Sequence, residues 1–373
     1  MPGIFGCIDR NGDPVPKEIA MGMADSLKHE DWYVDKWIFD SCVLGTVELE
    51  FLNNEHNLVY GKGKSLVCAL RGAVYNKQNL SEKFGIKYIS PYLNDARFII
   101  ELYDKKGLDF VKYLNGLFSV AIYDRRKGRV VVANDRYGFY PMFYCLNSKR
   151  FAFASEAKAI LRDPVGIPQI NKNAIPEFFT FSFVFGDKTF FQNIKLMLPS
   201  NMLVYDQPKN HLYVRNYWDF TSKHDAHTCE YKPLETYLKE FKKLMKKAVE
   251  SRVQDKKRIG VFLSGGLDSR VVTAFASETN KDIVTFTFGV KGCLQKEIAD
   301  EVSRRLGVQN IFYKIPPDFV ASYAEDIVYK GDGLIRICDC HFIALLEKVR
   351  RKVDTVLLGT FGPLFGWGRG KHA

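Results

Sequence analysis

Cysteine is scarce in this sequence, and no two cysteines have metal-binding or redox spacing. The 373 residues contain 8 cysteines, and none of them forms a Cys-x-x-Cys pair. No basic segment followed by an apolar core opens the chain, so we expect no signal peptide. Together these absences predict reduced, buried thiols in the cytoplasm. A metal site at His224, His227 and Cys229 is conceivable, but these residues lie in a polar stretch that is more typical of an ordinary loop.

Long apolar runs are also missing. A membrane helix needs about 18 or more consecutive apolar residues. The nearest approach, residues 178–185, is short and interrupted by Thr180 and Ser182, so we expect a strand there and no membrane span. The 28 glycines and 14 prolines follow no period, which excludes a collagen-like or low-complexity chain. An apolar content of 46% predicts a folded protein, and the length suits two domains.

Charge is plentiful, with a formal net charge of +11. Nucleic-acid binding is one explanation, but the basic stretches lack the interleaved aromatic residues that such binding favours. A second explanation is a solvated helix face, because the lysines of residues 239–247 alternate with apolar residues at helical spacing. A third is attraction of a polyanionic ligand such as ATP. We favour the second and third explanations together over nucleic acid.

The first part of the chain, residues 1–206, has the pattern of strands with separate helices. Strands are predicted at 65–74, 116–123, 129–133 and 151–154, and helices at 95–105 and 173–179. This arrangement predicts an α+β layered domain. The polar stretch that follows predicts a linker over 207–231.

From residue 232 to 373, apolar strands alternate with helices. Strands are predicted at 258–263, 283–288, 309–314 and 354–358, and helices at 269–278, 296–306, within 318–329 and within 340–351. Such alternation predicts a parallel sheet with helices on both faces. Ligands of these sheets bind at the carboxyl ends of the strands.

A phosphate-binding loop is predicted at residues 264–269. They read Ser-Gly-Gly-Leu-Asp-Ser, directly follow an apolar strand and open a helix. Two glycines let backbone N–H groups approach an anion, the helix N-terminus adds its dipole, and Ser264 and Ser269 add hydroxyl groups. Asp268 beside a phosphate requires a cation between them, and Mg²⁺ is the natural choice. The competing explanation is an ordinary capped helix.

The next strand ends beside this loop if the sheet is parallel. The loop resembles that of the ATP pyrophosphatases, and this resemblance implies that the last residues of the strand border the adenosine, although a core strand that ends in a glycine turn explains them equally well. The candidate ATP-binding set is Leu263, Ser264, Gly265, Gly266, Leu267, Asp268, Ser269, Thr287, Phe288 and Gly289, with Asp268 as the Mg²⁺ ligand.

The loop is not a Walker loop, because Gly-Lys-Ser/Thr is absent. The first domain resembles glutamine amidotransferases of the N-terminal-nucleophile class at residues 1–6, 115–124, 134–138 and 151–159. The pairing is similar to glutamine-hydrolysing asparagine synthetases over nearly the whole chain. It implies an N-terminal-nucleophile-hydrolase-like domain followed by an adenine nucleotide alpha-hydrolase-like domain. β-Lactam synthetases and lasso-peptide cyclases share this architecture, so the resemblance leaves the acceptor open.

The first domain departs from the family at its catalytic residues. Family members carry the nucleophilic Cys at position 2, where this chain has Pro2. Cys7 cannot replace it, because its nitrogen lies in a peptide bond and is not a free amine. Arg71 stands for the family's oxyanion Asn, and Ala73 for a Glu that contacts the glutamine amine. Of the residues that form the family's glutamine pocket, this sequence keeps Gly72 and Asp95. We therefore expect a folded domain that is inactive towards glutamine.

The second domain departs near its end. The family's acidic Asp-Glu pair before Leu-Phe-Gly is absent from residues 358–366, so the second Mg²⁺ carboxylate is missing. The family also continues past the position of Ala373 with a helical region that builds the acceptor pocket. We expect this chain to be truncated or to receive that region from a homodimer mate or a partner subunit.

These observations favour an ATP-dependent amide ligase. The resemblance implies that it uses ATP and Mg²⁺ to adenylate a small carboxylate, with aspartate as the first candidate, and then transfers ammonia to it. The alternative is a non-catalytic relative that binds nucleotide or a partner subunit. A nucleic-acid-binding protein is the remaining hypothesis, and only the net charge supports it.

Overall fold

The computed structural model divides the chain into two compact units. The first comprises Met1–Lys223 and Tyr329–Ile335, and the second comprises His224–Val328 and Arg336–Ala373. The structure describes residues 3–49, 57–86, 94–165, 169–219, 232–253, 258–279, 282–337, 340 and 343–359. None of the helices in these ranges is long and apolar enough to cross a membrane.

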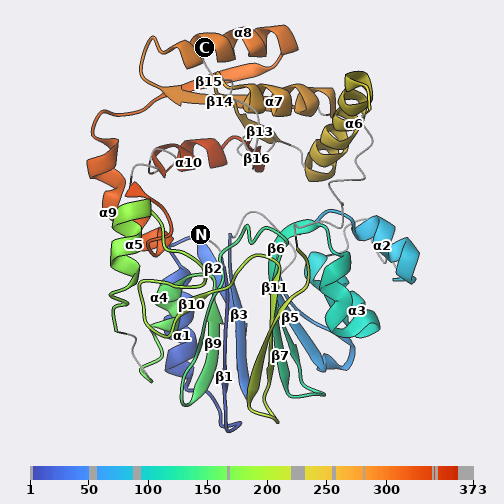
Figure 1. Ribbon diagram of the computed structural model, residues 1–373, viewed down its shortest axis with the longest axis vertical. Coiled ribbons are helices and arrows are strands. Elements are labelled where there is room, and N and C mark those ends of the chain that lie inside the picture. The colour runs from blue at the N-terminus through green and yellow to red at the C-terminus, as the bar shows by residue number, and fades with distance from the viewer. Residues whose placement is uncertain are drawn as a thin grey trace. The chain divides into compact units, whose positions relative to one another are not determined.

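Two antiparallel sheets form the centre of the first unit (Figure 1). One has the strand order β10-β8-β9-β1-β3-β2 and the other β12-β11-β7-β6-β5-β4. The strands are β1 (Gly3–Asp9), β2 (Tyr33–Ile38), β3 (Cys42–Leu49), β4 (Leu58–Tyr60), β5 (Leu66–Val74), β6 (Gly116–Asp124), β7 (Arg129–Asn134), β8 (Phe143–Leu146), β9 (Arg150–Ala154), β10 (Lys195–Leu196), β11 (Asn201–Asp206) and β12 (His211–Asn216).

Helices cover the outer faces of both sheets. They are α1 (Lys17–Leu27) and α4 (Ala157–Ile160) on the first sheet and α2 (Lys77–Phe84) and α3 (Asp95–Lys106) on the second, while α5 (Ala174–Phe181) is a further helix of this unit. One buried cluster lies between the sheets, a second joins α1 and α4 to the first sheet, and a third joins α3 to the second sheet. The layers therefore run helix, sheet, sheet, helix, which confirms the predicted α+β layered fold.

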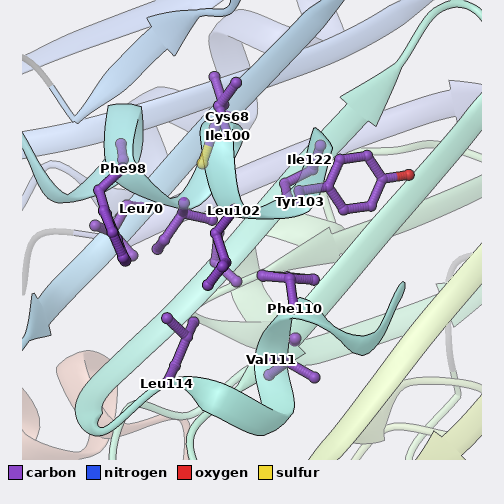
Figure 2. Close-up of a cluster of buried hydrophobic side chains, with 14 of the residues drawn as sticks. Cys68, Leu70, Phe98, Ile100, Leu102, Tyr103, Phe110, Val111, Leu114 and Ile122 are labelled. Atoms are coloured by element: carbon purple, nitrogen blue, oxygen red, sulfur yellow. The ribbon is translucent and has the colours of Figure 1, made fainter. Parts of the chain in front are cut away.

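Helix α3 shows how the sequence makes one of these layers. Asn94 caps its N-terminus by accepting a hydrogen bond from the N–H of Arg97, and Gly107 at φ +56° ends it. Its buried residues recur at helical spacing and point at β5 and β6. Figure 2 shows side chains of this helix, including Ile100 and Leu102, against strand residues such as Leu70.

Two expectations for this unit need correction. Residues 178–185 do not form a strand: the first four end α5, and Ser182 at φ +64° closes that helix. The pattern of alternating Phe residues favoured a strand, but residues 178–181 continue α5 and residues 182–185 follow it without regular structure. Within the predicted linker 207–231, β12 pairs with β11 along its whole length, whereas residues 220–231 lie outside the described ranges.

The second unit contains a four-stranded sheet in the order β15-β14-β13-β16, and all of its pairings are parallel. Its elements are α6 (Leu234–Val253), β13 (Ile259–Phe262), α7 (Leu267–Thr279), β14 (Ile283–Gly289), α8 (Leu294–Leu306), β15 (Gln309–Lys314), α9 (Phe319–Gly331), α10 (Ile343–Arg350) and β16 (Thr355–Leu357).

Both faces of this sheet bear apolar residues, as parallel strands require. Val261 packs with Val249 of α6 and Ala276 of α7 on one face, while Phe286 packs with Val349 of α10 on the other. The predicted alternation of strands and helices is confirmed, with boundaries that shift by no more than three residues.

Candidate nucleotide site and glutaminase-like pocket

The loop between β13 and α7 is shaped by its own serine hydroxyls. Ser269 Oγ accepts from the N–H of Ser264 at 3.1 Å and lies 3.0 Å from Ser264 Oγ. The N–H of Gly266 donates to Ser264 Oγ at 3.3 Å. Ser269 is buried and Ser264 is exposed. Ser269 therefore fixes the loop from inside, and Ser264 has a surface open to a ligand.

Asp268 lies in the first turn of α7, where the backbone N–H groups have no carbonyl partner within the helix. Its side chain is partly exposed and forms no ion pair with a residue in the described ranges. Free N–H groups and a helix dipole suit an anion, and a free carboxylate suits a divalent cation bound to that anion. Among the described residues, no three or more His, Cys, Asp or Glu side chains are grouped so that they could hold a metal ion by themselves. A cation at Asp268 would therefore need oxygens from a ligand such as a phosphate.

Strand β14 meets the loop through a buried hydroxyl. The N–H of Leu263 donates to the carbonyl of Phe286 at 2.9 Å, and Thr287 Oγ1 lies 2.8 Å from the carbonyl oxygen of Leu263. Thr287 is only 2% exposed. Its hydroxyl thus supports the last residue before the loop instead of facing solvent.

Asn310 on β15 supports Thr287 in turn, and sequence reasoning missed it. Its Oδ1 lies 3.0 Å from the hydroxyls of both Thr285 and Thr287, and its Nδ2 donates to Asp300 at 2.8 Å. The contacts arise because Thr285 pairs with Asn310 in the parallel register. No local pattern signals such a residue, since the register forms only in the folded sheet.

The remaining candidates on β14 sit at its carboxyl end. Phe288 packs edge-on against Phe262, with ring centroids 5.7 Å apart. A Cβ at Gly289 would come within 2.9 Å of Cys293 Sγ, so close packing against the following turn explains this glycine.

A third strand end reaches the same loop. Gly359 follows β16, and a Cβ there would lie 2.7 Å from the carbonyl carbon of Asp268 and from the backbone nitrogen of Ser269. The ends of β14, β13 and β16 therefore converge on residues 264–269, at the carboxyl edge where parallel sheets bind ligands. Residues 360–366, which include Pro363, lie outside the described ranges.

In the first unit, Arg71 is buried in β5. Its guanidinium lies over the ring of Tyr140, 4.4 Å from the centroid. Burial lowers the pKa of Arg71, and interaction with Tyr140 and Glu156 opposes this shift. Gly72 has φ +109°, and a Cβ there would lie 2.0 Å from the carbonyl oxygen of Leu117, so only glycine fits.

Both carboxylate oxygens of Asp95 already contact other groups of this protein. Its Oδ2 accepts from the N–H of Val74 at 2.7 Å, and its Oδ1 pairs with Lys77. Sequence reasoning missed Lys77, because an ion pair between residues 18 positions apart leaves no local signal. The ammonium of Lys77 therefore contacts the carboxylate that the family resemblance assigns to the glutamine amine.

Cys7 lies in β1 and is fully buried. Burial raises the pKa of its thiol well above the ordinary value, so the thiolate needed for nucleophilic attack is strongly disfavoured. Pro2 lies outside the described ranges.

Comparison with known proteins gives the family. The model of the glutamine amidotransferase domain matches residues 1–218, and that of asparagine synthase matches residues 240–363. The chain belongs to the glutamine amidotransferase domain family over its first part, and an asparagine synthase domain follows. This confirms the resemblance and the two predicted fold classes.

The curated relatives are longer than this chain. It is 29% identical to the provisionally named glutamine-hydrolysing asparagine synthetase 2 of Methanocaldococcus jannaschii, over 78% of this chain and 60% of the relative. It is 28% identical to asparagine synthetase 2 of Bacillus subtilis, over 72% of this chain and 37% of the relative. A solved glutamine phosphoribosylpyrophosphate amidotransferase from B. subtilis aligns at 12% identity over 83% of this chain and 65% of its own, with a TM-score of 0.41, which is too low to support an inference.

Proposed function

We propose that this chain is an ATP-dependent amide ligase of the asparagine synthetase type, which adenylates a carboxylate and transfers ammonia to it. The resemblance favours aspartate as the acceptor. The observation that carries the proposal is the convergence of three parallel strand ends on the loop 264–269. The six described cysteines are free thiols, which suits a cytoplasmic enzyme.

The reaction would need little covalent chemistry from the chain. A carboxylate oxygen attacks the α-phosphorus of ATP and pyrophosphate leaves. Ammonia then attacks the acyl carbon, AMP leaves with the bonding electrons, and a proton passes to water. The backbone N–H groups of the loop and of α7 would hold the pyrophosphate, and Asp268 would hold Mg²⁺. When bound, Mg²⁺ supplies positive charge against the phosphate oxygens.

We also propose that the first unit does not hydrolyse glutamine. Three observations support this: Pro2 supplies no thiol, Cys7 is buried with a raised pKa, and Lys77 pairs with Asp95. Purified protein incubated with L-glutamine should release glutamate at the same background rate as its Cys7→Ser variant. A wild-type rate clearly above that control would refute the loss of activity.

Calorimetric titration with Mg-ATP tests the nucleotide site. We expect Asp268→Ala to weaken binding by roughly tenfold or more, because a charge-assisted contact to the bound cation is lost. Asp326→Ala is the matched control, since Asp326 is an exposed carboxylate on α9. Equal affinity in wild type and Asp268→Ala would remove Asp268 from the site.

Turnover is tested by following AMP and pyrophosphate with aspartate plus ammonium, and then with other carboxylates. Formation of both products would support the ligase. The alternative of a non-catalytic relative is favoured by the missing acidic pair before Leu364. Absence of ATP binding by the wild type would support that alternative, whereas binding without turnover would point to an acceptor region supplied by another chain.

A further inference from the structure

One short segment of the first unit lies far along the sequence from the rest of that unit. The crossover segment, Tyr329–Ile335, belongs to the first unit although the residues on both sides of it belong to the second. It contains the end of α9 and a tight turn in which the N–H of Leu334 donates to the carbonyl of Gly331 at 2.9 Å. Asp332 at φ +48° and Gly333 at φ +78° give this turn its left-handed backbone. Asp tolerates that conformation better than most residues, but it is not relaxed there.

The carboxylate of Asp332 anchors the segment. The N–H of Ala157 donates to its Oδ2 at 2.6 Å, and Lys158 Nζ donates to its Oδ1 at 3.2 Å. The side chains of Asp332 and Lys158 are 7% and 10% exposed. Burial raises the pKa of Asp332, and Lys158 opposes that shift. The carboxylate is thus held at an energetic cost, which generic packing of the segment would not require.

The anchor continues into a chain of buried polar groups. Lys158 also pairs with Glu156, and Nε2 of His29 lies 2.9 Å from both carboxylate oxygens of Glu156. The side chain of Tyr329 covers these polar groups, because its ring faces the ammonium of Lys158 at 4.8 Å and packs edge-on against His29 at 5.8 Å. The segment therefore contributes the charge of Asp332 to this network of polar groups and covers the network with the ring of Tyr329.

The crossover segment forms one wall of a small cavity in the first unit. Its other walls include Arg71, Ser155 and Glu156, and its volume is about 40 Å³. A water molecule needs roughly 10–15 Å³ measured in this way, so the cavity has room for about three waters. With the segment in place, Arg71 is only 8% exposed.

We propose that the crossover segment acts as a plug: it blocks access to the cavity and is held there by the carboxylate of Asp332. Pairing of Asp332 with Lys158 and the Ala157 N–H keeps it seated, and while it is seated Arg71 and the cavity are closed to amino-acid-sized molecules. This proposal concerns contacts within the first unit and does not depend on the ligase activity proposed above.

Arginine modification by phenylglyoxal in the full-length protein tests the plug. Asp332→Gly removes the carboxylate and relaxes the positive-φ backbone, so this variant should fold. We expect Arg71 to be protected in wild type and to react roughly tenfold to a hundredfold faster in Asp332→Gly, the range that follows from leaving buried donors unpaired. Arg150 is an internal reference, since it is buried against Asp163 in another part of the unit.

Ser182→Gly is the matched control. Ser182 also has positive φ but is exposed, so its replacement relaxes the backbone without touching the plug, and Arg71 should stay protected. Sodium acetate should restore protection of Arg71 in Asp332→Gly, whereas sodium chloride at the same ionic strength should not, because only acetate can replace the lost carboxylate. If Asp332→Gly unfolds and Arg150 also reacts, Lys158→Met provides the second variant. Unchanged protection of Arg71 in the folded variants, or equal effects of acetate and chloride, would overturn the proposal.

Discussion

Thr287→Val isolates the hydroxyl that joins β14 to the residue before the phosphate loop. Valine keeps the shape of threonine, so the change leaves no large cavity. It removes one O–H from a site where the carbonyl of Leu263 and Oδ1 of Asn310 lie 2.8 and 3.0 Å away. Oδ1 of Asn310 still has the hydroxyl of Thr285, but the carbonyl of Leu263 loses a buried partner.

Leaving a buried acceptor unpaired costs about 1–3 kcal/mol. With an m-value of about 2 kcal/mol/M, the urea midpoint of the second unit should fall by roughly 0.5–1.5 M. Affinity for Mg-ATP should fall as well, because Leu263 directly precedes the loop and holds its first residue in place. Urea unfolding followed by intrinsic fluorescence and calorimetric titration measure the two effects. Thr287→Ser, which keeps the hydroxyl and loses only a methyl group, is the control. A Thr287→Val protein that matches wild type in midpoint and affinity would refute the role of this hydroxyl.

Three further predictions test other parts of the molecule. Gly359→Ala should cost about 1–3 kcal/mol and weaken Mg-ATP binding, because its Cβ would lie 2.7 Å from the backbone of Asp268, and titration beside urea unfolding would detect both effects. Burial acts to raise the pKa of Glu156, but its hydrogen-bonded histidine and the nearby lysine lower it overall. The stabilisation from Glu156 should therefore be full above its ordinary pKa of 4.5 and be lost as the pH falls, so urea midpoints of wild type and Glu156→Gln should converge in acid. Iodoacetamide at pH 8 should modify the partly exposed Cys293 and spare buried Cys7 in the folded protein, and mass spectrometry of the peptides would expose the opposite pattern.

Much of this fold could be predicted from the sequence because its signals are local. Strand 309–314 and helix α3 follow from the spacing of apolar residues and, for α3, from a capping asparagine and a terminal glycine. The prediction of a phosphate-binding loop also rests on a local signal, since six consecutive residues carry it. Residues 178–185 show the limit of such patterns: alternating phenylalanines fit a strand, but the first four residues belong to α5 and the rest have no regular structure.

The partners of individual polar groups were decided only by the tertiary structure. Asp95 with Lys77, Thr287 with Asn310, and Asp332 with Lys158 are all separated in sequence, and each pair forms because folding brings two elements together. An ion pair or hydrogen bond depends on distances of a few ångströms, which no one-dimensional pattern specifies. The sequence by itself determined where most of the helices and strands lie, and the phosphate-binding loop and the loss of glutaminase residues stay predictions from it. Only the fold decided which groups pair with carboxylates such as Asp95 and Asp332, because those contacts depend on register and packing between distant segments.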